Sequence, residues 1–242
     1  MTRRRWIADT ASETSASLTG SQAEHLARVL RAQPGAQADI VANGRVYRAQ
    51  IASVSNEEIL FTLLEEIPAG SAMPITLLMA IFKFDRMEWA IEKATELGVA
   101  SIVPVIARRT EKHLAQAADK RVERWRRLAH EAAKQSRRSD LPTVEEPITL
   151  PLRLQQPSSA QHILLAEDER NITLRQRIES ALQSTENDLP NFELAIGPEG
   201  GWTSEEIALF AKHQWQSASL GPRILRAETA AIAALAIASS LL

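Results

Sequence analysis

The sequence contains no cysteine among its 242 residues. This absence excludes disulfide bonds, zinc sites built on thiolates and catalysis by a cysteine nucleophile. The five histidines are scattered and show neither the His-x-x-x-His nor the Glu-x-x-His spacing of a metal site. We therefore expect a protein that binds no metal.

Aromatic residues make up only 5% of the chain, so stacking on bases is not expected to be its main way of binding nucleic acid. Two nucleotide motifs are also absent. No Gly-x-Gly-x-x-Gly follows the first strand of the expected α/β domain, and no Gly-x-x-x-x-Gly-Lys-Ser/Thr occurs anywhere. A dinucleotide or a nucleoside triphosphate is therefore a disfavoured ligand.

Long apolar runs are missing too. The alanine-rich stretch 227–242 is too short to cross a bilayer, and we expect it to form a buried helix. The basic residues Arg3–Arg5 are not followed by the apolar segment of an export signal. These features predict a cytoplasmic protein that does not associate with membranes.

Two domains are expected. Residues 1–67 contain short β-prone runs (38–41, 45–51 and 59–64), a helix over 22–30, and an Asn43-Gly44 pair that favours a hairpin. They predict a small β-barrel-like module. A linker rich in proline and glycine covers 68–74.

From residue 75 to 242 strand-like and helix-like segments alternate, which is typical of an α/β domain with a mainly parallel sheet. Strands are expected at 75–82, 101–106, 162–166, 192–196 and 217–220, and helices at 85–97, 118–138, 172–182, 204–212 and 227–242.

Two glycine-rich turns stand out, Ala195-Ile-Gly-Pro-Glu-Gly-Gly-Trp-Thr203 and Leu220-Gly-Pro-Arg-Ile-Leu-Arg-Ala-Glu-Thr-Ala230. Each follows an expected strand and leads into an expected helix, so both belong where ligands bind in open α/β sheets. Thr203 and Glu206 form a capping-box pattern for the helix after the first turn. We expect the two turns to form one ligand pocket, although tight connections without a ligand are the alternative.

The first turn carries the carboxylate of Glu199 but no lysine or arginine. It therefore suits a neutral or cationic ligand better than a phosphate. S-adenosylmethionine fits these requirements, because backbone groups can hold its adenine and its sulfonium can lie near carboxylate and carbonyl oxygens.

The two turns together resemble the signature of the RsmE family, SPOUT-class methyltransferases that act on N3 of a uridine in 16S ribosomal RNA. The resemblance extends over the whole chain. The segment 25–31 resembles the PUA-like module of that family, 87–98 resembles the first helix of its catalytic domain, and 135–138 resembles a Gln-Ser/Cys-Gly-Arg element in which Arg137 replaces the usual glycine.

The resemblance implies a PUA-like RNA-binding domain over 1–67 and a SPOUT domain over 75–242, with a deep trefoil knot over about 163–230. It also implies a homodimer and a pocket for S-adenosylmethionine made by three loops. The residues expected to bind this cofactor are Leu165, Ala166, Glu167, Ile196, Gly197, Pro198, Glu199, Gly200, Gly201, Leu220, Gly221, Ile224 and Leu225. The helix 227–242 is an interface candidate, and an intramolecular core helix is the alternative.

Methylation of uridine N3 requires loss of its proton and exposure of the base edge. A guanidinium beside O2 or O4 would stabilise the negative charge that develops on the base. We expect Arg226 to do this and Thr229 to position the ring. Glu228 is the candidate base, with electrostatics at a helix N-terminus as the alternative.

The formal net charge is −2, but the segment 108–138 holds eleven Lys or Arg and four Asp or Glu. Its helix has a basic face, which is either a solvated surface or an RNA contact. With the resemblance, we expect 16S rRNA within the 30S subunit as the partner. The expected RNA-binding residues are Arg3, Arg4, Arg5, Arg28, Arg31, Arg109, Arg124, Arg127, Lys134, Arg137, Arg138 and Arg223. Another SPOUT RNA methyltransferase, such as a ribose 2′-O enzyme, and a non-catalytic RNA-binding assembly factor are the alternatives.

Overall fold

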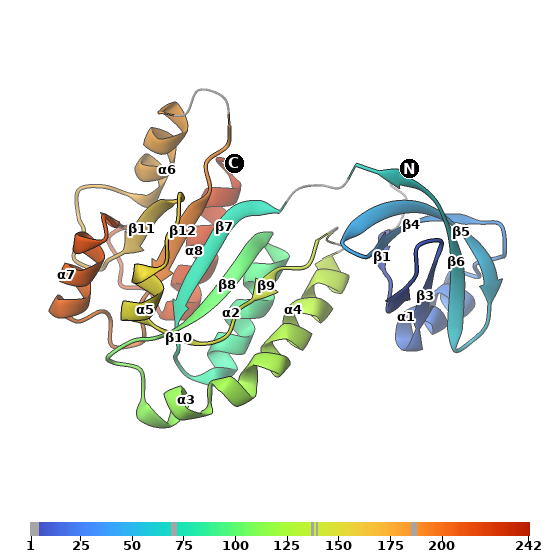
Figure 1. Cartoon of the computed structure of the whole chain (residues 1–242), viewed down its shortest axis with the longest axis horizontal. Coiled ribbons are helices and arrows are strands. Elements are labelled where there is room, and N and C mark those ends of the chain that lie inside the picture. The colour runs from blue at the N-terminus through green and yellow to red at the C-terminus, as the bar shows by residue number, and fades with distance from the viewer. Residues whose placement is uncertain (1–4, 69–71, 137, 139, 185–187) are drawn as a thin grey trace. The chain divides into compact units, whose positions relative to one another are not determined.

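The computed structural model describes residues 5–68, 72–136, 138, 140–184 and 188–242 (Figure 1). Contacts within the chain divide it into two compact units. Unit 1 takes residues up to 71 together with 133–141, and unit 2 takes 72–132 and 142–242. The domain limits expected from the sequence stay a prediction. The grouping of 133–141 with unit 1 was not predicted, because one helical pattern runs through residue 133.

Unit 1 contains a curled six-stranded sheet in the order β1-β4-β5-β6-β3-β2. The strands are β1 Arg5–Ile7, β2 Thr10–Ala11, β3 Ser15–Thr19, β4 Gln37–Ala42, β5 Arg45–Val54 and β6 Glu58–Ile67. A helix α1, Gly20–Glu24, continues into a π-helical segment, His25–Val29. The expected strands β4, β5 and β6 are confirmed. The strands β1, β2 and β3 were not predicted, because β1 and β2 have only three and two residues and β3 is mostly Ser and Thr.

The hairpin between β4 and β5 turns at the expected pair. Asn43 and Gly44 adopt φ angles of 52° and 75°, the left-handed conformation that a two-residue hairpin loop requires at both positions. The prediction from the Asn-Gly pair is therefore confirmed.

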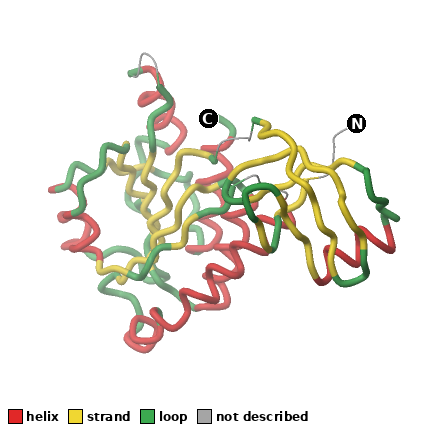
Figure 2. The backbone as a smooth tube through the Cα atoms, turned by 45° about the vertical axis from the view of Figure 1, so that its right-hand side comes forward, coloured by secondary structure: helices red, strands yellow, loops and turns green. Residues whose placement is uncertain are grey.

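Unit 2 is built on a seven-stranded sheet whose described pairings are all parallel. The path is β10-β8-β7-β12-β11-β13, and β9 pairs with β8. The strands are β7 Met73–Ala80, β8 Val99–Ile106, β9 Thr143–Val144, β10 Ile148–Thr149, β11 Gln161–Leu165, β12 Phe192–Ile196 and β13 Gln216–Ala218. The predicted α/β class with a parallel sheet is confirmed, and the two sheets are drawn in yellow in Figure 2.

Helices cover both faces of this sheet because its strands are apolar on both sides. Along β7, Leu77 and Met79 enter one core and Leu78 and Ala80 enter the other. The first core also takes side chains from α2 Phe84–Glu96, α4 Val122–Ser136, α6 Leu174–Gln183 and α8 Ala227–Ser239, and the second from α5 Leu150–Gln155 and α7 Ser204–Lys212.

The helix expected over 118–138 corresponds to α4, which begins at Val122 and ends at Ser136. A short helix α3, Lys112–Ala117, and a 3₁₀ turn, Asp119–Arg121, come before α4. Trp125 of α4 is fully buried in the first core. The short elements β9, β10 and α5 lie between the expected helix 118–138 and the expected strand 162–166, where no helix or strand was predicted.

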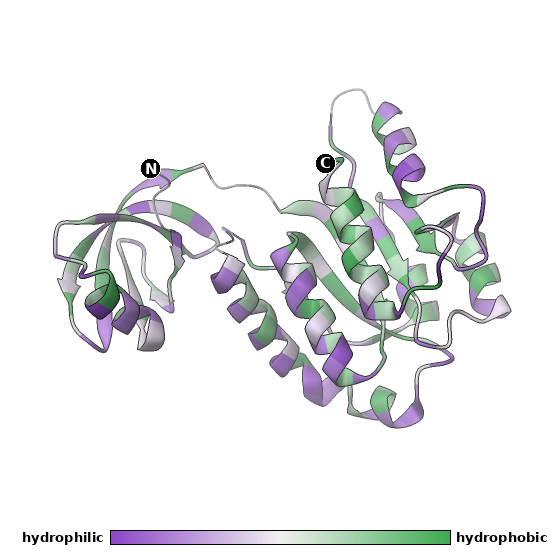
Figure 3. Cartoon of the chain, turned by 180° about the vertical axis from the view of Figure 1, so that it is seen from behind, coloured by the Kyte–Doolittle hydropathy of each residue, from purple (hydrophilic) through white to green (hydrophobic). Residues whose placement is uncertain are grey.

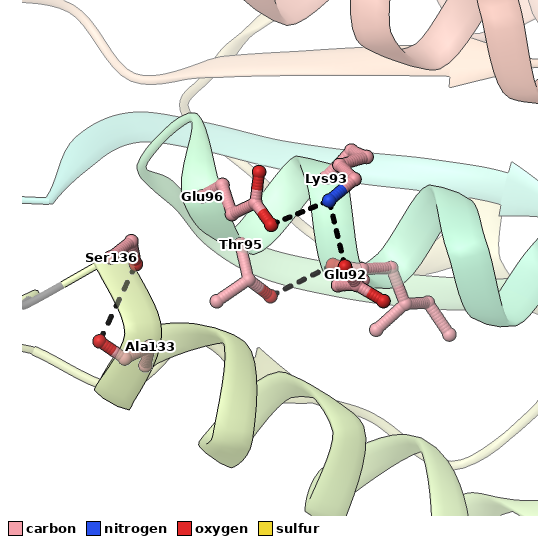
Figure 4. Close-up of polar contacts among 7 residues, drawn as sticks. Glu92, Lys93, Thr95, Glu96, Ala133 and Ser136 are labelled. Carbon is pink, nitrogen blue, oxygen red and sulfur yellow. Dashed lines mark hydrogen bonds and ion pairs between the residues drawn. The ribbon is translucent and has the colours of Figure 1, made fainter.

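Ion pairs join neighbouring side chains on the polar side of α2. Lys93 Nζ lies 2.7 Å from Oε1 of both Glu92 and Glu96, as Figure 4 shows. Thr95 Oγ1 donates to the carbonyl oxygen of Ile91 at 2.8 Å. This arrangement leaves the apolar side of α2 free to pack on the sheet.

Helix α8 packs against α2 and α6 and contacts β7 and β12, although β13, the strand before it, lies at the end of the sheet. The knot expected over about 163–230 stays a prediction. No helix among the described residues is long and apolar enough to cross a membrane.

Candidate functional site

The loops that leave β7, β8, β11, β12 and β13 gather at the carboxyl edge of the unit 2 sheet, where parallel α/β sheets bind ligands. They enclose a cavity of about 490 Å³. The lining comes from both predicted glycine turns and from the loop after β11, so the three segments expected to form one pocket do meet. This volume lies in the range of sites for small molecules and cofactors.

The expected cofactor-binding residues lie in this lining. Those are Leu165, Ala166, Glu167, Ile196, Gly197, Pro198, Glu199, Gly200, Gly201, Leu220, Gly221, Ile224 and Leu225. Their contact with a cofactor stays a prediction. Further lining residues were not predicted, namely Lys83, Arg86, Asp168, Arg170, Trp202, Ile207, Ala218, Ser219, Ala227 and Ala230. The sequence placed Lys83 and Arg86 at a helix start with no sign that they reach the glycine turns.

The first glycine turn is tight. Gly201 adopts a φ of 71° and its N–H donates to the carbonyl oxygen of Pro198 at 2.8 Å. Gly197 lies against the Trp202 ring, and a Cβ at residue 197 would come within 3.1 Å of Trp202 Nε1. The turn therefore needs glycine at 201 for its backbone conformation and at 197 for close packing.

The first glycine turn and the helix after it are also joined to the loop after β8 by hydrogen bonds. Glu206, only 5% exposed, accepts hydrogen bonds from the backbone N–H of Arg108 at 2.8 Å and of Thr203 at 2.9 Å. Glu206 N–H in turn donates to Thr203 Oγ1 at 3.3 Å. The capping box predicted from Thr203 and Glu206 is confirmed, and the same carboxylate joins two loops of the site.

Arginines hold the centre of the first turn. Arg109 Nη1 donates to the carbonyl oxygen of Gly200. Arg86 Nη1, from the first turn of α2, donates to Glu199 Oε1 at 2.7 Å, and Lys83 Nζ lies 4.0 Å from Glu199 Oε2. The carboxylate expected to face a cationic ligand is therefore already paired with a cation of the chain.

The loop after β11 forms a third wall. Ala166 N–H donates to the carbonyl oxygen of Ala218 at 3.1 Å, which joins this loop to β13. Further along, the backbone N–H groups of Asn171 and Ile172 donate to Glu169 at 2.8 and 3.2 Å and lower the pKa of that carboxyl group. The loop therefore has a defined path beside the cavity.

The second glycine turn supplies exposed side chains. Ser219 Oγ accepts from Gly221 N–H at 3.1 Å and so fixes the start of the turn. Arg223 and Arg226 line the cavity and are exposed, and Ile224 is 73% exposed. An exposed apolar side chain between two arginines is suited to contact with a nucleic-acid ligand.

The three residues expected to act in catalysis are not placed alike. Arg226 lines the cavity, whereas Glu228 and Thr229 do not. Glu228 is 7% exposed, its Oε1 lies 3.9 Å from Arg86 Nε, and its Oε2 has no hydrogen-bond partner among the described residues. Thr229 is exposed. The roles expected of these residues stay predictions.

The expected RNA-binding residues differ in how they are paired. Arg28 is paired with Glu24 at 2.7 Å, Arg124 with Glu88 at 2.8 Å, and Lys134, itself half-buried, with Asp9 at 2.6 Å. Arg138 is buried and bonded to Asp140.

Among the others, Arg5 is half-buried, and Arg31 and Arg127 are exposed. Arg109 and Arg223 line the cavity, and Arg3, Arg4 and Arg137 lie outside the described residues. The structure thus brings Arg109 and Arg223 to one site, and RNA binding by the set stays a prediction. Within the described ranges no group of His, Asp or Glu side chains could hold a metal ion.

Comparison with protein-family models matches residues 69–239 to an RNA methyltransferase domain and residues 18–64 to an RNA methyltransferase PUA domain. Among curated proteins, the chain is 36% identical to ribosomal RNA small subunit methyltransferase E of Synechocystis sp., over 95% of this chain and 74% of the relative. It is 32% identical to the protein of the same name in Bacillus subtilis, over 92% and 89% of the two chains.

Solved structures agree. A ribosomal RNA small subunit methyltransferase E from Neisseria gonorrhoeae, bound to S-adenosyl methionine, superposes with a TM-score of 0.77 at 27% identity over 99% of this chain and 98% of that chain. A methyltransferase from Legionella pneumophila in complex with its cofactor SAM gives a TM-score of 0.76 at 27% identity over 99% and 98%. From the family match and these relatives, the chain belongs to the RNA methyltransferase family of ribosomal RNA small subunit methyltransferase E, the RsmE family.

Proposed function

We propose that the protein transfers the methyl group of S-adenosylmethionine to N3 of a uridine in 16S ribosomal RNA, within the 30S subunit and in the cytoplasm. The observation that carries this proposal is the cavity of about 490 Å³ between three loops of a family-typical fold. The relatives named above are small-subunit rRNA methyltransferases, and two similar structures hold the cofactor.

The residues present fit the methyl donor. The first glycine turn offers a backbone that a ligand can approach closely, and Leu165, Ile196 and Leu225 add apolar walls. Glu167 and Asp168 supply carboxylates on the opposite loop, where they can offset the positive charge of a sulfonium. When bound, the donor supplies an electrophilic methyl group.

For methyl transfer to the base, the N3 proton passes to water. A carbon–nitrogen bond then forms between N3 and the donor methyl group as the sulfur–carbon bond breaks, and the demethylated donor is the leaving group. Arg226 lines the cavity and is exposed, so its guanidinium can approach O2 or O4 of the uracil. There it stabilises the negative charge of the deprotonated ring in the transition state. Thr229, exposed in the first turn of α8, positions the ring.

Substrate RNA is held through phosphates. Arg223, beside Arg226 in the second turn, and Arg109 in the loop after β8 both line the cavity. Arg5, Arg31 and Arg127 extend the basic set over the described chain. Guanidinium groups bind phosphate strongly and without reading sequence.

The active form is a homodimer. Apart from Glu228 and Thr229 near its start, α8 is made of alanine, isoleucine and leucine until Ser239, and it shows little purple beside the C-terminal label in Figure 3. A helix that is apolar all round is expected to be covered on all sides. Ala236 is nevertheless exposed, which fits coverage by a second copy.

The proposal is tested by incubating the purified protein with 16S rRNA, or with 30S subunits, and a donor carrying a deuterated methyl group. Nucleoside mass analysis should then find labelled N3-methyluridine. A labelled 2′-O-methyl nucleoside would instead support a ribose methyltransferase. If calorimetry detects no binding of S-adenosylmethionine, the protein is a non-catalytic assembly factor.

A further inference from the structure

Arg86 connects the two glycine turns of the cavity. It stands in the first turn of α2, and its side chain is 32% exposed. Nη1 donates to Glu199 Oε1 in the first turn at 2.7 Å. On its other side, Nε lies 3.9 Å from Oε1 of Glu228, at the start of the helix that follows the second turn.

The two carboxylates differ in their surroundings. The Glu199 side chain is 33% exposed and lines the cavity. The Glu228 side chain is 9% exposed and does not line the cavity. Burying a carboxylate is costly unless a cation compensates it. Among the described residues, Arg86 is the cation paired with Glu228.

A base that takes a proton from the uracil must come within hydrogen-bond reach of N3. Glu228 is buried behind the lining, and its free oxygen Oε2 is buried as well. Arg86 lines the cavity, and no hydrogen bond from its Nη2 is found in the described part of the chain. Arg86 is therefore placed to reach a ligand in the cavity, whereas Glu228, which does not line it, contacts Arg86.

We propose that Arg86 is a positioning residue of the methyl-transfer site, and that Glu228 acts as its buried counter-ion instead of as the base. This inference rests on the proposed function. Arg86 holds Glu199, and with it the first glycine turn, at a fixed distance from the second turn. Glu228 orients the guanidinium so that Nη1 meets Glu199 and Nη2 faces the ligand.

The test is a double-mutant cycle with Arg86→Gln, Glu228→Gln and the two combined, measured as kcat, KM for the donor and donor affinity by calorimetry. Each single variant should raise the KM for S-adenosylmethionine roughly tenfold, and the double variant should be no worse than Arg86→Gln, because contacting residues couple. If the effects of the two single variants on KM multiply in the double variant, the two residues act independently and the proposal is overturned.

The pH profile of kcat distinguishes the two roles of Glu228. If Glu228 acts through Arg86, Glu228→Gln lowers the rate by a similar factor at every pH and keeps the acidic limb of the wild-type profile. Loss of that limb would identify Glu228 as the base and overturn the proposal.

Two further variants keep the proposal testable if Arg86→Gln does not fold. Glu199→Gln removes the same bond from the other side and should reproduce the effect of Arg86→Gln, whereas Arg86→Lys should restore part of the affinity through its charge. Arg175→Gln, which removes an exposed pair with Glu179 in α6, is the matched control and should behave as wild type. If wild-type protein does not bind the donor, the proposed function fails; if it binds and the Arg86 variants bind equally well, only this inference fails.

Discussion

Arg109 donates a hydrogen bond to the carbonyl oxygen of Gly200 and lies so close that a Cβ at residue 200 would be 3.2 Å from Arg109 Cδ. These residues are 91 positions apart in the sequence. At Gly200 the first glycine turn therefore packs against a side chain that can move, since Arg109 is exposed and flexible. Gly197, in the same turn, instead faces the buried ring of Trp202.

This difference predicts unequal effects of two alanine substitutions. Gly197→Ala should lower the free energy of unfolding by about 1–3 kcal/mol, because the Trp202 ring packs on Phe210 and cannot yield. Gly200→Ala should cost less than about 1 kcal/mol but weaken donor binding, because Arg109 must leave the turn. Urea unfolding and calorimetry measure the two effects. Equal losses of stability would contradict the distinction.

Glu206 should contribute more to stability than an ordinary capping residue. Glu206→Ala is expected to lower the free energy of unfolding by about 2 kcal/mol, because the backbone N–H groups of both Thr203 and Arg108 lose their acceptor. The matched control is Gln176→Ala, in the capping box of α6 with Thr173, for which about 0.5–1 kcal/mol is expected. Similar losses for both variants would show that the bond to Arg108 adds nothing.

Arg226→Ala should reduce kcat about 100-fold or more while leaving donor affinity close to wild type, because the guanidinium acts on charge that appears only in the transition state. Single-turnover methylation assays and calorimetry measure the two quantities. Arg226→Lys should recover only part of the rate. Full activity in Arg226→Ala would remove this residue from the mechanism.

His162 predicts a pH dependence of stability. Burial is the main cause of its lowered pKa; nearby Glu193, 3.9 Å away, opposes the shift and Arg153 adds to it. The unfolded chain therefore takes up a proton near pH 6.5 that the folded chain resists. The His162 contribution is present above that pH and is lost as the pH falls toward the folded pKa.

In urea unfolding at about pH 7.5, 6.5 and 5.5, His162→Gln should show a shallower fall of stability than wild type. The exposed His113→Gln is the matched control. A wild-type slope in His162→Gln would assign the pH dependence to other groups. Glu193 and Arg153 face His162 from β12 and α5, with Arg153 Nη2 2.7 Å from Glu193 Oε1, and should be kept unchanged.

Ala236→Arg should convert the proposed dimer to a monomer, because it places a charge on an apolar face of α8. Sedimentation velocity measures the change. Ala211→Arg, at an exposed position of α7, is the control and should leave the dimer intact. A wild-type molecular mass for Ala236→Arg would place the interface elsewhere or remove it.

Local patterns in the sequence determined much of this protein. The hairpin at Asn43-Gly44, the strand Phe192–Ile196, the helix Ser204–Lys212 and the Thr203–Glu206 capping box follow from residues within a few positions of one another. The glycine turns also predicted the walls of the cavity, because a strand followed by glycine and a helix places its turn at the carboxyl edge of a parallel sheet.

Only the tertiary structure decided which charges meet. Arg86 reaches Glu199 across 113 positions. The backbone N–H of Arg108 likewise reaches the Glu206 carboxylate across 98 positions. The tertiary structure also pairs Lys134, which the sequence assigned to RNA, with Asp9, and buries Glu228 next to Arg86. Ion pairs between distant segments leave no periodic signal in a sequence, since they depend on which strand ends lie side by side; here the sheet order β8-β7-β12 brings those loops together.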